Sequence, residues 1–339
     1  MPLVRVVIPT YNRAALVPEA IESVLVQTFC DYEVVIADDG STDETERVVK
    51  RFSADDPRVR YLVLRHGGAA RARNAAIKKP GQYRYIAFLD SDDLWPTYHL
   101  EQAVEALERE QSAALFFGMF LKRTLIGSEA ESTQEPKPVR NPLGRATRTF
   151  GKDLYLLTDV DCVQAILLSE FAPHTSTVVV RPDAVKRAEW FNPKFEVFED
   201  LDFFLRLALD GGNFAYHDVI HCYRRRFGDN LTELKDLSSP ILLRRYHSVA
   251  RYFQIKLSIC KSSEQRNSVV QEIAQAFFII GECNREQSDL RASRVAYWKS
   301  LRYHWSAHAL RGFLLSLLPY PIYSVLRNVK TSLRAATLQ

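Results

Sequence analysis

Short apolar runs alternate with amphipathic stretches through the first 120 residues, and this alternation restricts the fold more than any other feature. The runs have the length of buried strands, and the stretches between them repeat apolar residues at the spacing of one helical face. Strands that alternate with helices predict a mostly parallel sheet with helices on both faces. The predicted strands are Val4–Ile8, Glu33–Ala37, Arg60–Leu64 and Tyr85–Leu89, and the predicted helices include Asp43–Phe52 and Ala69–Lys78.

Polar clusters follow three of these strands. Thr10–Asn12 follows the first strand, Asp38–Ser41 the second, and Asp90–Asp93 the fourth. Sheets of this kind bind ligands beyond the carboxyl ends of their strands. We therefore expect the three loops to converge on one edge of the sheet and to form a binding site there.

The cluster Asp90-Ser91-Asp92-Asp93 places three carboxylates at the end of a buried strand. Carboxylates that leave water together repel one another, and a divalent cation would offset that cost. Mg²⁺ is usually held by one or two carboxylates and by substrate phosphates. In an extended chain Asp90 and Asp92 would point to the same side. The pattern predicts a cation that holds a diphosphate, and the alternative is a polar loop in which Asp93 caps the next helix.

The composition is that of a globular protein. Its 339 residues can hold one large domain, or a domain of roughly 200–250 residues with an appendage. The net charge is only +4, and the five cysteines lack metal-site spacing, which favours a reduced, cytoplasmic protein. The N-terminus shows no signal-peptide pattern. The sequence contains no run of 18 apolar residues, so we expect no helix that spans a membrane.

The chain changes character twice beyond residue 120. Residues 126–161 are polar and contain three prolines, which indicates a long excursion or lid. Strand signals resume at Thr175–Val180, a helix follows Glu199-Asp200, and Phe214–Tyr223 predicts one more strand. After roughly Pro240 the pattern is helical.

Five motifs together resemble glycosyltransferase family 2. Four of them are Val6–Arg13, Ala37–Asp43, Ala72–Asn74 and Phe88–Asp93, and the fifth is Phe198–Asp200 with the following Phe204–Leu207. The resemblance covers roughly residues 4–235. It implies the GT-A fold, a nucleotide-sugar donor, and transfer with inversion at the sugar carbon.

The resemblance also implies a donor site. Pro9, Thr10 and Tyr11 would surround a uracil base, and Asp39 would accept a hydrogen bond from its imide N–H, which cytosine lacks. Arg73, at a basic helix start, is a candidate contact to the nucleotide or its diphosphate. Taken alone, these residues are typical of a surface turn and a solvated helix. With either interpretation, Ser41 or Thr42 is expected to cap the helix that follows.

The same resemblance assigns the metal ligands and the base. Asp92 would bind Mn²⁺ or Mg²⁺, and Asp90 would share the metal or contact the ribose. Asp200 would be the general base that removes the acceptor proton, and Glu199 would support it or bind the acceptor. The alternative for Asp200 is an N-cap of its helix.

One stretch departs from the family pattern. Many members carry a histidine shortly after a Tyr-Arg pair, whereas here Tyr223-Arg224 is followed by Arg225 and Arg226. A third protein ligand to the metal is therefore open. The arginines would either bind the diphosphate or cover an exposed strand edge.

The sequence therefore predicts an α/β chain of the GT-A fold, with a catalytic domain at residues 1–238 and a helical C-terminal extension at residues 239–339. We expect residues 1–120 to bind the nucleotide sugar and residues 121–238 to bind the acceptor. The predicted reaction moves a sugar from a UDP-sugar to a saccharide or lipid-linked acceptor in cell-surface polysaccharide or glycolipid synthesis. The alternatives are a non-catalytic sugar-nucleotide-binding or scaffold protein, and a nucleotidyltransferase, which would need a glycine-rich basic loop where this chain has Pro9–Arg13.

The C-terminal segment suggests a further partner. Residues 291–339 contain eight Lys or Arg and no Asp or Glu. Within it, Gly312–Tyr323 is apolar but too short and too interrupted by proline to span a bilayer. The segment predicts peripheral contact with an anionic membrane on its cytoplasmic face, and the alternative is a packed helical appendage. No nucleic-acid partner is expected, and the oligomeric state is open.

Overall fold

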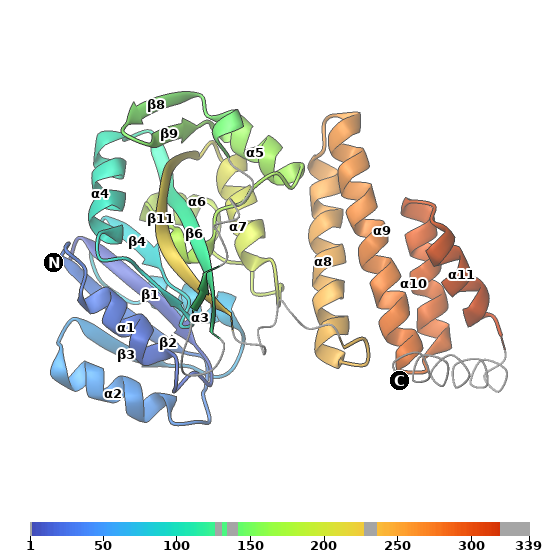
Figure 1. Cartoon of the computed structure of the whole chain (residues 1–339), viewed down its shortest axis with the longest axis horizontal. Helices are drawn as coiled ribbons and strands as arrows, with labels where there is room; N and C mark the ends of the chain where they lie inside the picture. The colour runs from blue at the N-terminus through green and yellow to red at the C-terminus, as the bar shows by residue number, and fades with distance from the viewer. Residues whose placement is uncertain (1, 126–130, 134–141, 227–235, 319–339) are drawn as a thin grey trace. The chain divides into compact units, whose positions relative to one another are not determined.

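The computed structural model describes residues 2–125, 131–133, 142–226 and 236–318. The contacts divide the chain into two compact units, Met1–Asn230 and Leu231–Gln339. The first unit combines strands with helices, and the second is built from helices (Figure 1). The predicted alternation of strands and helices, and the helical character of the C-terminal region, are both confirmed.

The first four strands form the parallel half of one sheet. β1 and β2 are buried at every position, which explains their nearly uninterrupted apolar sequences. The sheet has the order β3-β2-β1-β4-β10-β6-β11-β9-β8. The four strands, which pair in parallel, are β1 (Val4–Thr10), β2 (Tyr32–Asp38), β3 (Val59–Val63) and β4 (Tyr85–Phe88).

The other half of the sheet is mixed. The short strand β10 enters antiparallel between β4 and β6, and β11 then runs parallel to β6. A hairpin of β8 and β9 extends the sheet beyond β11. The strands of this half are β5 (Asp93–Leu94), β6 (Ala113–Leu125), β7 (Glu131–Thr133), β8 (Arg148–Gly151), β9 (Leu154–Leu157), β10 (Val179–Val180) and β11 (Asn213–Arg226).

Helices lie on both faces of the sheet, as side-chain alternation along β1 shows. Ile8 belongs to the buried cluster that contains Ile21 of α1 and Leu100 of α4. Arg5 points to the opposite face, where its guanidinium donates to the carbonyl of Ala76 in α3 at 3.2 Å. The helices of this unit are α1 (Val17–Leu25), α2 (Thr45–Asp55), α3 (Ala69–Lys78), α4 (His99–Arg109), α5 (Asp159–Leu167), α6 (Pro182–Arg187) and α7 (Glu199–Leu209).

Some local expectations were wrong. The helix expected from Asp43 begins at Thr45, and neither Ser41 nor Thr42 caps it: Asp43 accepts from the Thr45 N–H at 3.0 Å, while the Ser41 hydroxyl accepts from Asn12 N–H at 2.9 Å. The stretch expected as one strand at Thr175–Val180 is a short 3₁₀ helix, Thr175–Thr177, followed by β10.

The region expected to be a polar excursion, residues 126–161, contains several regular elements. A second 3₁₀ turn, Pro142–Arg145, precedes the hairpin of β8 and β9, and α5 begins at the end of the region. Residues 126–130 and 134–141 lie outside the part of the chain that the structure describes.

Three histidines form a buried chain between α4 and β11. His99 Nδ1 lies 3.1 Å from His221 Nδ1, and His221 Nε2 lies 2.9 Å from His217 Nδ1. His99 Nε2 is buried without a hydrogen-bond partner among the described residues. The least costly tautomers therefore have His99 Nδ1–H donating to His221 and His221 Nε2–H donating to His217, because only a lone pair is then unpaired. Burial lowers the pKa of all three, that of His99 to about 3.

Acid should destabilise the first unit through this chain. The folded-state pKa of each histidine lies below its unfolded value of about 6.5, so the unfolded state binds more protons and stability is lost as the pH falls below about 6.5. Each histidine that must stay neutral costs about 1.4 kcal/mol per pH unit below that point. Denaturant titrations at pH 7, 6 and 5 measure how the free energy of unfolding depends on pH.

His99→Asn, whose amide can replace Nδ1, should weaken this dependence on pH. The control His308→Asn, at an exposed position, should leave it unchanged. An equal dependence on pH in His99→Asn and in the wild type would contradict a role for the histidine chain.

In the second unit, a buried tyrosine of α10 packs closely against glycines of α9 and α11. Tyr297 is fully buried, and a Cβ at Gly281 or Gly312 would come within 2.7 and 2.5 Å of its ring. The side chains of Ser262, Asp289 and Ser306 cap successive helices. Among the described residues, no helix has both the length and the apolar sequence needed to cross a bilayer. The helices are α8 (Pro240–Ile259), α9 (Ser263–Glu286), α10 (Leu290–Tyr303) and α11 (Ala307–Ser316).

Candidate functional site

The loops after β1 and β2 meet at a carboxylate that is held by backbone amides. Asp39 is buried, and the N–H groups of Gly67 and Gly68 donate to its two oxygens at 2.9 and 2.7 Å. Gly68 has φ +92°, a conformation that favours glycine. The amides of this glycine-rich turn therefore position Asp39.

Two neighbouring aromatic rings and a hydroxyl without a hydrogen-bond partner among the described residues lie near Asp39. The ring of Tyr11 is 40% exposed and lies 4.3 Å, centre to centre, from the ring of His66, which is itself 2.9 Å from Asp39. The buried hydroxyl of Thr10 has no partner among the described residues. An exposed ring, a fixed carboxylate and an unpaired hydroxyl are groups that a planar base with polar edges can engage.

The acidic segment after β4 is a turn, so the arrangement considered for an extended chain does not apply. The N–H of Asp93 donates to the Asp90 carbonyl at 3.0 Å, and the chain then enters β5. Arg225, which is buried, fixes the turn by donating from Nε to the Asp92 carbonyl at 2.7 Å. Asp93 does not cap a helix: its carboxylate accepts from the Ser176 hydroxyl at 2.6 Å.

This turn brings together oxygen ligands for a cation. One carboxylate oxygen from each of Asp90, Asp92 and Asp93 lies within 4.8 Å of the others. Burial, together with the neighbouring charges of Asp93 and Asp90, raises the pKa of Asp92 to about 6. A divalent cation would relieve this repulsion, so the residues present fit one. Asp93 also belongs to a second group with His174 and Cys222, whose ligand atoms likewise lie within 4.8 Å of one another, but Mg²⁺ and Mn²⁺ prefer the oxygen ligands of the acidic turn.

Arg73 connects the acidic turn with the start of α7. Its guanidinium donates to Asp90 at 2.7 Å and to Glu199 at 2.8 Å. Burial works against ionisation of Asp90, but Arg73 outweighs it and lowers the pKa of this carboxyl. Arg73 is buried and bridges these two protein carboxylates. Its predicted contact with the nucleotide or diphosphate stays a prediction.

Glu199 and Asp200 occupy the first turn of α7 and have different surroundings. Burial and the adjacent Asp200 raise the pKa of Glu199 to about 7, against the pull of Arg73. Asp200 Oδ2 accepts from the Thr175 hydroxyl at 3.2 Å. The N-cap of α7 is Phe198, with φ +69° and no side-chain capping bond, so Asp200 does not act as the cap.

The segment 174–176 ties these groups together, although its importance was not apparent in the sequence. The Thr175 hydroxyl reaches Asp200, that of Ser176 reaches Asp93, and His174 Nε2 lies 3.2 Å from Asp93. The polar residues before β10 were the only sequence signal for this segment, and we interpreted them as part of a strand. The structure thus joins the acidic turn and the α7 acids through one segment and through Arg73, and gathers Thr10, Tyr11 and Asp39 at the neighbouring strands.

Residues 5–171 match the sequence model described as Glycosyl transferase family 2. The chain is 31% identical over 241 residues to chondroitin synthase of Pasteurella multocida, covering 70% of this chain and 22% of that protein. It is 39% identical over 121 residues to the putative teichuronic acid biosynthesis glycosyltransferase TuaG of Bacillus subtilis, covering 35% of this chain and 48% of that protein. The chain therefore spans less than half the length of these relatives.

Solved structures resemble the chain in fold. Residues 1–349 of Staphylococcus aureus TarS in complex with UDP-GlcNAc give a TM-score of 0.56 at 16% identity, over 93% of this chain and 90% of that one. The mannosyltransferase PcManGT of Pyrobaculum calidifontis, in complex with GDP-Man and Mn²⁺, gives 0.54 at 18% identity, over 99% and 86%. The mixed sheet with its flanking helices is the predicted GT-A fold, which is confirmed.

Proposed function

Because this chain belongs to glycosyl transferase family 2, we propose that it is an inverting glycosyltransferase that uses a UDP-sugar. The proposal is carried by one observation: hydrogen bonds connect the carboxylates of the acidic turn with the two carboxylates at the start of α7. The acidic turn at Asp90–Asp93 is linked to Asp200 through Thr175 and Ser176, and to Glu199 through Arg73. A leaving diphosphate and an attacking hydroxyl need such groups on opposite sides of one sugar carbon.

The donor nucleotide is proposed to lie against the loops after β1 and β2. Pro9, Thr10 and Tyr11 would contact the uracil, with the exposed Tyr11 ring as its stacking surface. Asp39, fixed by two amides, keeps lone pairs that can accept from the imide N–H. The TarS structure that resembles this chain contains UDP-GlcNAc, in keeping with a UDP donor.

The cation is proposed to be Mn²⁺ or Mg²⁺, held by Asp92 and, in part, by Asp90. Asp90 already shares its charge with Arg73, which makes Asp92 the leading ligand. When bound, the cation would supply electrostatic stabilisation of the leaving diphosphate. Arg225 holds the Asp92 backbone in place, which would keep the ligand oriented.

Transfer is proposed to be a single displacement. The acceptor hydroxyl oxygen forms a bond to the anomeric carbon as the bond from that carbon to the diphosphate oxygen breaks, and UDP leaves with the electron pair. The acceptor proton passes to an Asp200 carboxylate oxygen, which Thr175 orients. Glu199, held by Arg73, would support Asp200 or bind the acceptor.

We propose that residues 1–120 form the nucleotide-sugar half and residues 121–238 the acceptor half of the catalytic domain, followed by the helical extension.

The acceptor class is a saccharide or a lipid-linked sugar. A relative that is 37% identical over 115 residues, WfgD of Escherichia coli, is named for glucosyl transfer to GlcNAc-diphosphoundecaprenol. A cytoplasmic protein attached peripherally to the membrane would reach such an acceptor, and the basic C-terminal segment is a means of attachment.

Base selection tests the donor site. We expect wild-type protein to bind UDP about 5–150-fold more tightly than CDP, because an unmatched buried carboxylate contact costs about 1–3 kcal/mol. Asp39→Asn, which can both donate and accept, should narrow this preference. Titration calorimetry with both nucleotides at saturating Mn²⁺ measures it. Equal affinities of the wild type for CDP and UDP would remove Asp39 from base recognition.

A further inference from the structure

One face of α10 combines exposed cations with exposed apolar side chains. The face consists of Arg291, Val295, Trp298, Lys299 and Arg302, whose spacing puts them on one side of the helix. Val295 is 50% exposed and Trp298 is 48% exposed. We call this set the α10 face.

Within the described ranges, the cations of the α10 face have no acidic partners. None of the three forms a salt bridge with any residue in the described parts of the chain. Two of them lie over aromatic rings instead: Lys299 Nζ is 5.2 Å from the centre of Phe277, and the Arg302 guanidinium is 4.9 Å from that of Trp298. Residues 291–339 contain no acidic side chain that could compensate them. The face is therefore complementary to an anion.

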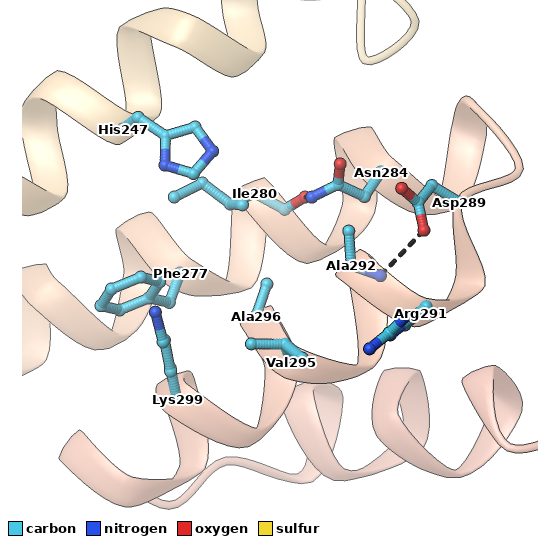
Figure 2. Close-up of a pocket in the computed structure, with 10 residues that line it drawn as sticks. All are labelled: His247, Phe277, Ile280, Asn284, Asp289, Arg291, Ala292, Val295, Ala296 and Lys299. Carbon is cyan, nitrogen blue, oxygen red and sulfur yellow. Dashed lines mark hydrogen bonds between the residues drawn. The ribbon is translucent and has the colours of Figure 1, made fainter.

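Two hollows border the α10 face, and Lys299 lines both. The first, of about 360 Å³, lies among α8, α9 and α10 (Figure 2). The second, of about 290 Å³, includes Trp298, Arg302 and Tyr303. The lining of the first hollow is Phe277, Ile280, Ala292, Val295 and Ala296, with His247, Asn284, Asp289, Arg291 and Lys299.

The first hollow joins an apolar interior to a positive rim. His247 and Lys299 both line this hollow, and burial together with the positive charge of Lys299 lowers the pKa of His247. Asp289 is the one acid among the described residues that line the hollow, and it caps α10 by accepting from the Ala292 N–H at 2.9 Å (Figure 2). Such a hollow can take the apolar part of a ligand whose anionic part remains at the rim.

These features favour a lipid surface over a soluble polyanion. A nucleic acid or an acidic polysaccharide would use the cations but would gain little from apolar linings. Exposed apolar residues continue beyond the face, with Trp305 at 67% and Leu314 at 55% exposure. Tryptophans and cations side by side are typical of residues that sit at the headgroup level of a bilayer.

We propose that the α10 face and its two hollows bind the surface of an anionic phospholipid bilayer, with lipid phosphates at Arg291, Lys299 and Arg302. This inference rests on the proposed peripheral attachment and assigns it to α10 rather than to the tail beyond residue 318. It does not depend on sugar transfer.

Vesicle flotation of the full chain tests the proposal. At low salt the wild type should float with vesicles of phosphatidylcholine and phosphatidylglycerol, but not with phosphatidylcholine alone, and high salt should weaken binding. Lys299→Glu/Arg302→Glu should reduce partitioning by about 30-fold or more, since each cation near an anionic surface contributes roughly fivefold. Trp298→Ala should reduce it at equal net charge.

Matched variants separate this face from general positive charge. Lys261→Glu/Arg266→Glu makes the same charge change at exposed positions of the same unit and should alter partitioning less than about threefold. Arg327→Glu/Lys330→Glu/Arg334→Glu reverses the tail and should also preserve most binding.

Three results would overturn the proposal: no flotation of the wild type at low salt, equal loss in the Lys261/Arg266 control, or loss only in the tail variant. A wild type that binds soluble hyaluronan but no vesicles would assign the face to an acidic polysaccharide instead. Calorimetric binding of UDP is measured on every variant, so that a failed attachment is distinguished from a failed transferase site.

Discussion

Asp200→Asn is expected to lower the sugar-transfer rate by about 100-fold or more while UDP binding stays within about twofold of wild type. Asparagine preserves the size of the side chain and can still accept from Thr175, but it cannot take the acceptor proton. Because Phe198, not Asp200, is the N-cap of α7, the substitution removes no capping bond, and the thermal midpoint should barely change. Initial rates of transfer with saturating donor, together with UDP calorimetry, measure both effects.

Glu199→Gln is the matched comparison. It removes the charge next to Asp200 and weakens the pair with Arg73, yet leaves the Asp200 carboxylate in place. We expect a smaller loss of rate than in Asp200→Asn. Turnover near the wild-type level in a folded, UDP-binding Asp200→Asn protein would leave the mechanism without its base, and a larger loss in Glu199→Gln would transfer that role to Glu199.

Asp92→Asn should change nucleotide affinity and stability in opposite directions. The gain in UDP affinity that Mn²⁺ provides should fall by about 10–100-fold or more, because the leading cation ligand is lost. Without metal the variant should be more stable by about 1 kcal/mol, since three carboxylates within 4.8 Å repel one another and one charge has been removed. Calorimetry with and without Mn²⁺, and denaturant titration in EDTA, give the two values.

Asp31→Asn, at an exposed position in the same unit, is the control and should alter neither quantity. An Asp92→Asn protein that retains the full effect of Mn²⁺ on UDP affinity would place the cation elsewhere. A variant that loses both the Mn²⁺ effect and stability would show that Asp92 serves the fold rather than the metal.

The parallel half of the sheet and the location of the site were predictable from local pattern. Val4–Ile8 and Glu33–Ala37 lie within β1 and β2, whose burial leaves a continuous apolar signal. Polar residues at the carboxyl ends of parallel strands lie at the same edge of the sheet, whatever the conformation of the loops. Thr10, Asp39 and Asp92 could therefore be assigned to one site from the sequence alone.

The connections within the site could not be predicted, because they join residues far apart in the chain. Arg73 pairs with Glu199 across 126 positions, and Ser176 with Asp93 across 83. The antiparallel entry of β10 brings the 174–176 segment to the acidic turn, and a two-residue strand leaves almost no periodic signal. Arg225 was one of three arginines in a row, and only the fold shows that it holds the Asp92 turn.

Metal-dependent transfer from a UDP-sugar is tested by measuring the release of UDP from a panel of UDP-sugars, with Mn²⁺ and with EDTA. The account predicts that wild-type protein releases UDP from at least one donor in the presence of Mn²⁺, that EDTA abolishes the release, and that Asp92→Asn reproduces the effect of EDTA. Binding of UDP that is indifferent to metal, or tighter binding of GDP and CDP with no reaction of any UDP-sugar, would contradict a metal-dependent UDP-sugar transferase.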